Sequence, residues 1–418
     1  MKKLLGLLLV AAIAFPASAA VIKNVELKGE VQTIASDVKY GMYNAYNRGA
    51  KTRALVGLSF DVVEDVKANL LFQYAYAWGD KNYLNNGFED GKGMRLANAN
   101  LVFSNLFGAL EATIGRQFYG EDGSPIIYFG PNHYNAEGLG YATSLDAAKL
   151  VYTNDTVTAT VLAGKVADLS NGFLADWWGP DEEEIRSNIF GADLKWNITE
   201  ELTANVYGYD FTNLAEYYER EYWDTWGDTK HVGVYGAKLG WTTDAFRASA
   251  EYARNFAGHR LIKEPKDVPY MVKADIAADI EAFTARGAFV YAKSNNDDAE
   301  SMPFVQLGNY APGMMFGHLM SRNMKQSIFN YSETGLRMFN LGFDYKPADQ
   351  WTVSLDGFSF QDRLGRHSGS LEADLTAKYD YNDYVQLFAG LAYAKYGHRV
   401  SALRSENYKA QIGTIVRF

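Results

Sequence analysis

The sequence predicts an all-β fold, a transmembrane antiparallel β-barrel of about 18 strands, and a count of about 16 also fits the pattern. Three observations support this prediction. Apolar and polar residues alternate along many segments, short connections alternate with long ones, and prolines avoid the alternating segments. A strand turns successive side chains to opposite faces, so alternation gives one apolar and one polar face. A closed barrel turns the apolar face toward lipid and leaves no unpaired strand edge.

The predicted strands follow one another along the whole chain after its first residues. Alternation is clearest in 245–256, where Phe246, Ala248, Ala250 and Tyr252 share one face, and it recurs in 369–380 and 384–394. In 93–104 the alternation changes phase, as a bulge or a shifted boundary would cause. The strands are expected at 24–34, 50–60, 67–78, 93–104, 109–118, 145–153, 156–164, 187–197, 202–211, 230–241, 245–256, 269–278, 282–292, 333–346, 351–360, 369–380, 384–394 and 408–418.

The connections alternate in length. Short turns such as 61–66, 105–108, 242–245 and 382–383 are expected in the periplasm, and the connections between them, of roughly 8 to 40 residues, are expected as extracellular loops. Proline has no backbone N–H to donate to a strand ladder, so a closed barrel should exclude it from strand interiors. The prolines fall in predicted loops or at the first residue of a strand or turn: Pro125, Pro131, Pro180, Pro265, Pro269, Pro303, Pro312 and Pro347.

The first residues have the pattern of a secretory signal peptide. Lys2 and Lys3 precede an apolar run, Pro16 follows it, and Ala17 to Ala19 supply small residues for cleavage. The run is too short to span a membrane. We therefore expect residues 1–19 to be removed and 20–418 to form a single barrel domain. The chain has no cysteine, which excludes disulfides and thiolate metal sites. No stripe of basic residues stands out in the sequence, so we do not expect nucleic acid as a partner.

Charged side chains recur on the polar faces of the predicted strands. A Lys or Arg facing lipid at mid-depth costs about 2–4 kcal/mol, so these residues are expected inside. They would set the ion selectivity of a water-filled lumen, or pair with one another along the wall. Their mixed signs leave the selectivity open. The predicted pore-lining residues are Lys195, Lys238, Arg247, Glu251, Lys273, Asp275, Arg286, Asp356, Glu372, Asp374, Lys378, Lys409 and Arg417.

Aromatic residues near the strand ends are expected to form girdles at the two membrane interfaces, where amphipathic rings prefer to lie. The predicted girdle residues are Phe60, Tyr76, Trp78, Phe103, Trp196, Trp241, Tyr345, Trp351 and Tyr379.

The last strand, 408–418, ends on Phe418. This end resembles the bacterial outer-membrane β-barrel proteins, in which a terminal Phe resembles the signal read by the assembly machinery. Gly115-Arg116-Gln117 resembles a triplet at a strand end in porin-like families, including the alginate-export family, although strict alternation puts Arg116 on the lipid face. Chain length and strand count also resemble the alginate-export and substrate-specific porin families. The resemblance implies a place in the outer membrane, contact with its lipid and lipopolysaccharide, and, as in many general porins, a homotrimer.

In the general porins the third loop folds into the barrel and narrows it. By that resemblance the third long loop here, 119–144, supplies constriction candidates. The rival is the loop 293–332, whose apolar stretches 302–304 and 314–319 are expected to pack into the lumen. The candidates in the third loop are Glu121, Asp122, Ile126, Ile127, Tyr128 and Phe129.

Two further loops, around 176–184 and 216–226, are rich in acids and aromatic residues. They suit a divalent cation, a sugar-binding rim or plain solvent exposure, but they lack the spacing of a calcium loop, so no metal site is predicted. The six histidines are scattered, and no nucleophile elbow appears. We therefore expect no enzymatic activity and no cofactor.

The sequence thus predicts a porin, a water-filled channel for the passive diffusion of small hydrophilic solutes. One alternative is a substrate-specific channel for an oligosaccharide or an anionic polysaccharide, as the alginate-export resemblance would imply. The mixed charges argue against that substrate. Another alternative is a non-conducting structural barrel.

Overall fold

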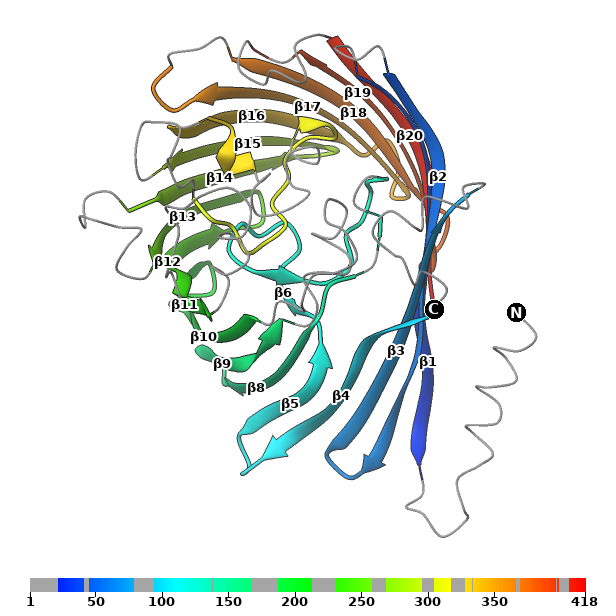
Figure 1. The fold of residues 1–418 in the computed structure, drawn as a ribbon, viewed down its shortest axis with the longest axis vertical. Coiled ribbons are helices and arrows are strands. Elements are labelled where there is room, and N and C mark those ends of the chain that lie inside the picture. Colours follow the sequence, from blue (N-terminus) through cyan, green and yellow to red (C-terminus); the bar gives the residue numbers. More distant parts are fainter. Residues whose placement is uncertain are drawn as a thin grey trace, which may run out of the picture.

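The chain forms a closed antiparallel β-barrel of 18 strands in a computed structural model (Figure 1). The structure describes residues 22–40, 45–78, 94–136, 139–140, 142–166, 187–212, 231–257, 268–294, 304–316, 328–332, 334–365, 369–395, 397 and 406–418.

Each of the predicted strands corresponds to one strand of the barrel. The barrel strands are β1 (Lys23–Tyr40), β2 (Ala45–Val63), β3 (Val66–Ala77), β4 (Arg95–Leu106), β5 (Leu110–Gln117), β8 (Leu145–Thr153), β9 (Val157–Val166), β10 (Ser187–Asn197), β11 (Leu202–Thr212), β12 (His231–Thr242), β13 (Phe246–Ala257), β14 (Tyr270–Ile280), β15 (Phe283–Lys293), β16 (Gly335–Tyr345), β17 (Trp351–Asp362), β18 (Ser370–Asp380), β19 (Val385–Lys395) and β20 (Glu406–Arg417). Three short elements lie outside this wall: β6 (Tyr119–Gly120), β7 (Tyr128–Phe129) and the 3₁₀-helix η5 (Ile328–Asn330).

The first and last strands close the barrel, as the sequence predicts. β1 and β20 run antiparallel from the pair Glu30–Arg417 to the pair Lys39–Tyr408. Beyond the end of β20, Phe418 exchanges two backbone hydrogen bonds with Gly29, at 2.8 and 3.1 Å. The Phe418 ring covers the face of Gly29, where a Cβ would lie only 2.6 Å from a ring carbon. The terminal aromatic therefore completes the closing seam.

Two strands differ from their expected limits. β1 continues to Tyr40 and β2 begins at Ala45, so most of the stretch expected as the first loop is paired strand. An ion pair between Asp37 and Arg48, at 2.8 Å, joins the two extensions. In β4 the change of phase is a bulge, because Leu71 pairs with Asn98 while its neighbour on β3 already pairs with Leu96.

The outer face of the barrel is apolar and widely exposed. Leu239, Leu341 and Ile412 are 53%, 59% and 64% exposed, as lipid-facing side chains are in a structure without lipid. Aromatic residues line both ends of this face, and all the predicted girdle residues lie on it. Between these aromatic girdles, the described outward positions carry no charged side chain. In the described residues no helix is long and apolar enough to cross a membrane.

Candidate pore and its inward loops

Strand pairing brings the predicted pore-lining residues onto the inner face in continuous rows. Residues paired across strands share a face, so one row can be followed around the wall. The first runs through Lys195, Asn205, Lys238, Glu251 and Lys273. It continues to Val290 and Met338, which are fully buried, so it faces inward.

A second row runs from strand β13 to β20. It contains Arg247, Arg286, Asp356, Asp374 and Lys409, and it ends at the buried Val38. The remaining four predicted residues lie on neighbouring inward rows: Asp275, Glu372, Lys378 and Arg417. All the predicted residues therefore share the interior of the barrel, and their part in conduction stays a prediction.

Two long loops fold into the interior from the same end of the barrel. The first joins β5 to β8 and contains β6 and β7, which lie in the middle of the barrel (Figure 1). The second joins β15 to β16. Tyr119 in the first loop shares a hydroxyl hydrogen bond of 3.0 Å with Tyr209 on the wall. The loops meet where Tyr128 N–H donates to the Leu307 carbonyl at 3.2 Å. Both loops that the sequence singled out as rivals therefore occupy the lumen together.

Apolar side chains bind the two loops into one core. Ile126, Ile127 and Phe129 of the first loop are 4–6% exposed and pack in the same cluster as Phe304 and Phe316 of the second. The Phe316 ring stacks on Phe360 of the wall, with centroids 4.1 Å apart. Of the apolar stretches expected to pack inward, 302–303 and 317–319 lie outside the described residues.

Wall carboxylates hold the second loop through its backbone. Asp374 accepts a hydrogen bond from Met314 N–H at 2.7 Å. Glu372 accepts bonds from Met315 N–H at 2.6 Å and Phe316 N–H at 2.8 Å. Lys409 donates to the Met314 carbonyl at 3.0 Å. Three successive backbone N–H groups of the second loop, those of Met314, Met315 and Phe316, thus rest on two wall carboxyl groups.

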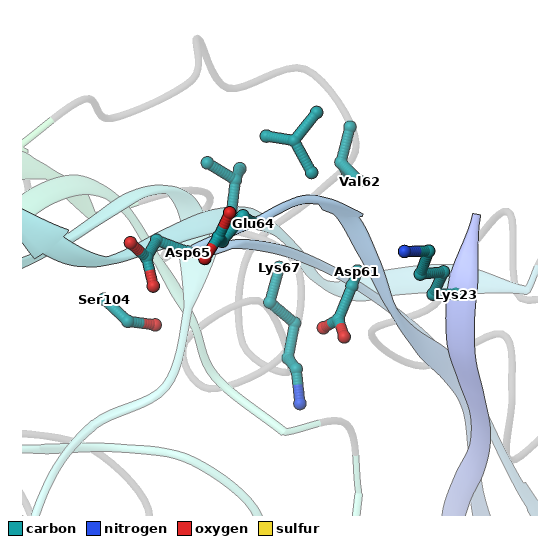
Figure 2. A pocket seen from close by; sticks show the side chains of 9 residues that line it. Lys23, Asp61, Val62, Glu64, Asp65, Lys67 and Ser104 are labelled. Carbon is teal, nitrogen blue, oxygen red and sulfur yellow. The ribbon is translucent and has the colours of Figure 1, made fainter. Parts of the chain in front are cut away.

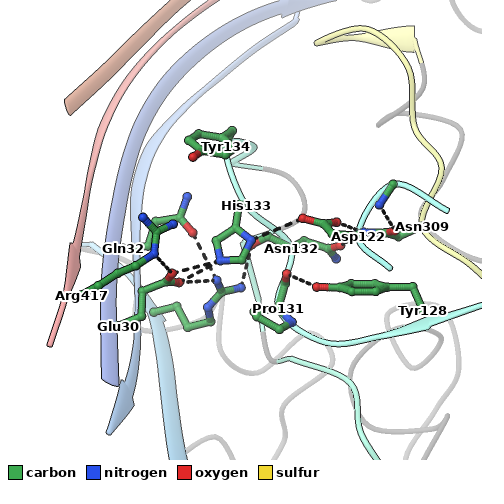
Figure 3. A network of polar contacts seen from close by, with 12 residues as sticks. Glu30, Gln32, Asp122, Tyr128, Pro131, Asn132, His133, Tyr134, Asn309 and Arg417 are labelled. Carbon is green, nitrogen blue, oxygen red and sulfur yellow. Dashed lines mark hydrogen bonds and ion pairs between the residues drawn. The ribbon is translucent and has the colours of Figure 1, made fainter. Parts of the chain in front are cut away.

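A second polar network holds the first loop against β1 and β2 (Figure 3). Arg53, only 1% exposed, donates to Glu30 at 3.1 Å and to the Asn132 carbonyl at 2.8 Å. His133 Nε2 lies 3.1 Å from Glu30, and its Nδ1 lies 3.5 Å from Asp122. The imidazole is therefore held between a wall carboxylate and a loop carboxylate.

The same network reaches the second loop through Asn309. Its amide donates to Asp122 at 2.6 Å and to the Asn132 side chain at 2.9 Å, and its carbonyl accepts from Gly123 N–H at 2.8 Å. One polar system therefore joins both loops and the wall.

The contacts in this network shift the pKa values of two loop residues, His133 and Asp122. Burial lowers the pKa of His133, but the hydrogen bonds to Asp122 and Glu30 outweigh it, and the net pKa lies above the ordinary 6.5. Burial raises the pKa of Asp122, but hydrogen bonds from His133 and Asn309 outweigh it, and the net pKa lies below the ordinary 3.8. Both groups are therefore charged in mildly acidic water.

These contacts define two parts of the wall. We call β18–β20 with β1 and β2 the clamped wall, because its inward charges hold the loops. Glu372, Asp374 and Lys409 are 4%, 4% and 3% exposed. They do not border an open lumen, as their prediction as pore-lining residues assumed, because the second loop covers them. Lys378 lies against the ring of Tyr134, at 4.0 Å from its centroid, and Arg417 lies 3.3 Å from Glu30.

We call the halves of β8–β12 nearer the turns the open wall, because the halves nearer the loops, with Leu162, Ile189 and Tyr209, are buried in the same apolar cluster as the first loop. Lys195 is exposed, and Lys149 and Lys238 are partly exposed. Within the described part of the chain, Lys195 and Lys238 make no ion pair or hydrogen bond, although Asp193 and Glu251 are electrostatic neighbours. These lysines are placed to act on ions in a passing solution.

Between the two parts, inward charges are paired along the wall. Arg286 binds Asp344 through two hydrogen bonds of 2.8 Å and reaches Asp356 at 3.0 Å. Arg247 lies 3.1 Å from Asp279. Lys273 pairs with Asp275. Glu251 is 8% exposed and accepts from the Tyr207 hydroxyl at 2.8 Å, so it too is shielded from the lumen.

Two residues singled out from the sequence, Glu121 and Arg116, do not belong to these interior networks. Glu121, a constriction candidate, is exposed at the tip of the first loop. Arg116 lies on the outward face, as alternation predicts, and binds Asp146 through two hydrogen bonds of 2.8 Å near the loop end of β5. It takes no part in the interior.

Sequence reasoning missed Arg53, His133 and Asn309 as members of the site. Arg53 has inward parity in its strand, so the rule that found the other charges would have found it. His133 and Asn309 lie in irregular loops that meet only in three dimensions, and no local pattern marks them.

An open hollow of about 680 Å³ lies at the other end of the barrel, around the turn between β2 and β3 (Figure 2). Its lining mixes Lys23, Asp61 and Lys67 with the turn residues Glu64 and Asp65. Its lining residues belong neither to the inward loops nor to β8–β12.

Several predictions lie outside the described residues: the signal peptide 1–19, the acidic loops 176–184 and 216–226, and four of the six histidines. Among the described residues, no group of three or more His, Asp or Glu is arranged to hold a metal ion.

The barrel is similar to solved structures over nearly its whole length. The crystal structure of Pseudomonas aeruginosa OccK3 (OpdO) matches with a TM-score of 0.62 and 11% identity, covering 96% of this chain and 97% of that one. Acinetobacter baumannii OccAB1 matches at 0.61 and 10%, covering 96% and 99%. The outer membrane protein opdK from Pseudomonas aeruginosa matches at 0.59 and 11%, covering 95% and 99%. No protein-family model and no curated protein matches the sequence. At these identities the likeness establishes the 18-stranded barrel fold, and the resemblance to the alginate-export family stays a prediction.

Proposed function

We propose that this chain is an outer-membrane porin, a channel through which small hydrophilic solutes diffuse passively. The observation that carries the proposal is the division of the wall into an uncharged apolar outer band and an inner face with rows of charged side chains. Lipid stabilises the first, whereas inward charges such as Lys195 and Lys238, which make no ion pair or hydrogen bond in the described structure, need water or a solute. The fold shared with the outer membrane protein opdK supports the same location.

Passage in this proposal follows the open wall. The two loops contact the barrel wall on both sides at its loop end, and beyond them the inner face of the open wall carries Lys149, Lys195 and Lys238. These cations raise the local concentration of anions, and the loops limit the size of the solute.

A second candidate is a substrate-specific channel. The joint occupation of the lumen by two loops favours it, since a narrow path discriminates among solutes more than a wide one. The mixed charges of the interior still give no support to a polysaccharide substrate.

Other parts of the proposal follow from the location. Residues 1–19 direct export, Phe418 is read by the barrel-assembly machinery, and outer-membrane lipid and lipopolysaccharide surround the barrel. A homotrimer would match the general porins. The proposed channel needs neither catalytic residues nor a cofactor.

Flux through liposomes tests the channel. Purified protein is inserted into liposomes, and swelling is followed with neutral sugars of increasing size. A porin gives swelling rates that fall smoothly with solute size, whereas a specific channel admits one sugar out of size order. Swelling no faster than in protein-free liposomes would refute both candidates.

A further inference from the structure

Cationic side chains gather on the outer face of the barrel, at the loop end of strands β13 to β17. Arg254 on β13, Lys293 on β15, Arg337 on β16 and Arg363 just past β17 all have outward parity. We call these four residues the rim patch. They are partly buried, and no function described above uses them.

Strand pairing places the rim patch beside tyrosines. Arg254 pairs with Tyr270, and Tyr270 pairs with Lys293. On the next rung Tyr291 pairs with Arg337, and Arg363 donates to the Tyr291 hydroxyl at 3.4 Å. Tyr270 and Tyr291 are ring neighbours with centroids 6.0 Å apart. Tyrosines mark the level of the lipid headgroups. The cations therefore lie at that level or up to two strand residues, about 7 Å, further from the membrane centre.

The rim patch contains no acid. The described outward positions of β12 to β19 carry no Asp or Glu. Outward acids at this end of the barrel, Asp37, Asp146, Asp210 and Glu406, lie on β1, β8, β11 and β20, and two of them are paired with Arg48 and Arg116. The rim patch is therefore a local concentration of positive charge on a chain with an acidic net charge of −10.

One guanidinium in the rim patch is incompletely satisfied. Arg337 donates to Gln361 at 2.7 Å, but its Nε is buried and has no hydrogen-bond partner in the described structure. Because the Nε is shielded, a phosphate oxygen would bind the terminal nitrogens of Arg337, which donate only the one hydrogen bond to Gln361 in the described structure, and such an oxygen is well suited to an arginine. Lys293 lies on the neighbouring strand β15, and its flexible side chain adds a positive point charge to the same surface.

We propose that the rim patch binds the phosphate groups of a phosphorylated lipid headgroup in the outer leaflet. The occupant is a glycolipid whose acyl chains lie on the apolar band below the tyrosines while its phosphates contact Lys293 and Arg337. This proposal rests on the proposed function only for the membrane in which the barrel lies. Its chemistry is independent of whether the lumen conducts.

Native mass spectrometry of the purified barrel tests the proposal with diphosphorylated lipid A as the probe. The wild type should retain the lipid in a saturable manner. The double variant Lys293→Gln, Arg337→Gln should bind about 25-fold more weakly, since one basic residue near an anionic membrane surface contributes about 1 kcal/mol, or about fivefold. The single variant Lys293→Gln should lose about fivefold, and its side chain makes no hydrogen bond or ion pair in the described structure, so folding is not at risk.

Matched controls separate the sources of binding. Lys165→Gln, an exposed outward cation on β9, should leave the affinity unchanged. Dephosphorylated lipid A should bind the wild type as weakly as diphosphorylated lipid A binds the double variant, and an excess of inorganic phosphate should not displace the lipid. Equal affinity of wild type and double variant, equal binding of the dephosphorylated lipid, or displacement by inorganic phosphate would each overturn the proposal. A barrel that binds lipid A in this manner but fails the swelling assay would refute the channel and leave the rim patch intact.

Discussion

The clamped wall and the open wall carry similar inward charges but use them differently. On the clamped wall, Glu372, Asp374 and Lys409 are buried and bonded to loop backbone. On the open wall, Lys195 and Lys238 face the lumen without such partners. A charge on the inner face therefore either holds a loop or stays uncovered, and we propose that the uncovered charges act on the ions that pass.

Removing the carboxylates of the clamped wall should have the largest effect on conduction. Glu372→Ala with Asp374→Ala deletes the acceptors of three backbone N–H groups, and leaving a buried donor unsatisfied costs about 1–3 kcal/mol each. The second loop should leave its seat, and single-channel conductance should rise severalfold. Asp146→Ala, which removes an acid on the outer face that is bonded to Arg116, is the control. Unchanged conductance in the double variant would mean that the apolar core alone holds the loop.

Breaking the Arg53 network should have the largest effect on stability. Arg53→Met removes the buried guanidinium from Glu30, which keeps His133, and leaves the Asn132 carbonyl without its donor, which should lower the free energy of unfolding by about 3–5 kcal/mol. Urea unfolding in lipid vesicles, followed by tryptophan fluorescence, measures it. Arg48→Met removes an exposed ion pair instead and should cost about 0–1 kcal/mol. Equal losses in the two variants would contradict the distinction between buried and exposed pairs.

Reversing charge on the open wall should change selectivity without moving a loop. In Lys195→Glu with Lys238→Glu, the reversal potential in a salt gradient should shift toward cations, and the conductance should stay near the wild-type value. Lys165→Glu, which alters a charge on the outer face, should leave the reversal potential in place. If both variants shift it alike, the inward assignment of the rows is wrong.

The smallest effect concerns pH. The pKa of His133 is raised, so its contribution to holding the first loop is complete below pH 6.5 and is lost as pH rises through the raised value. The lowered pKa of Asp122 makes its contribution complete above pH 3.8, and that contribution is lost as pH falls through the lowered value. The loop should therefore be held best between these limits. Current fluctuations should increase as pH rises from 6 toward 8, and His133→Gln should abolish that dependence. A pH response that survives the substitution would assign it to other groups.

The contrast between the two walls also explains what could be predicted from sequence. The period-2 alternation shows which face each strand residue takes, so the predicted charges share the inner face, and the predicted first strand, 24–34, lies in β1, which pairs with the last strand from Glu30 onward. Alternation says nothing about what covers a side chain, so it could not distinguish Glu372, which a loop covers, from Lys195, which is exposed. The network of Arg53, His133 and Asn309 joins residues up to 256 positions apart, and only the folded loops bring them together.

The limits of the first hairpin could not be predicted for a related reason. Residues 35–40 and 45–49 contain charged and polar side chains that resemble a loop, yet they continue the strands of β1 and β2 beyond the apolar band. Outside that band an outward charge such as Arg48 costs little, so the lipid rule that identifies strands no longer applies.

Conductance of the wild-type barrel in planar bilayers is the most direct test of a water-filled path along the open wall. Folded protein, identified by its shift on a heated gel, should insert in discrete steps with a linear current–voltage relation. Folded protein that inserts and carries no current above background would contradict the channel, because the loops would then close the lumen on both walls.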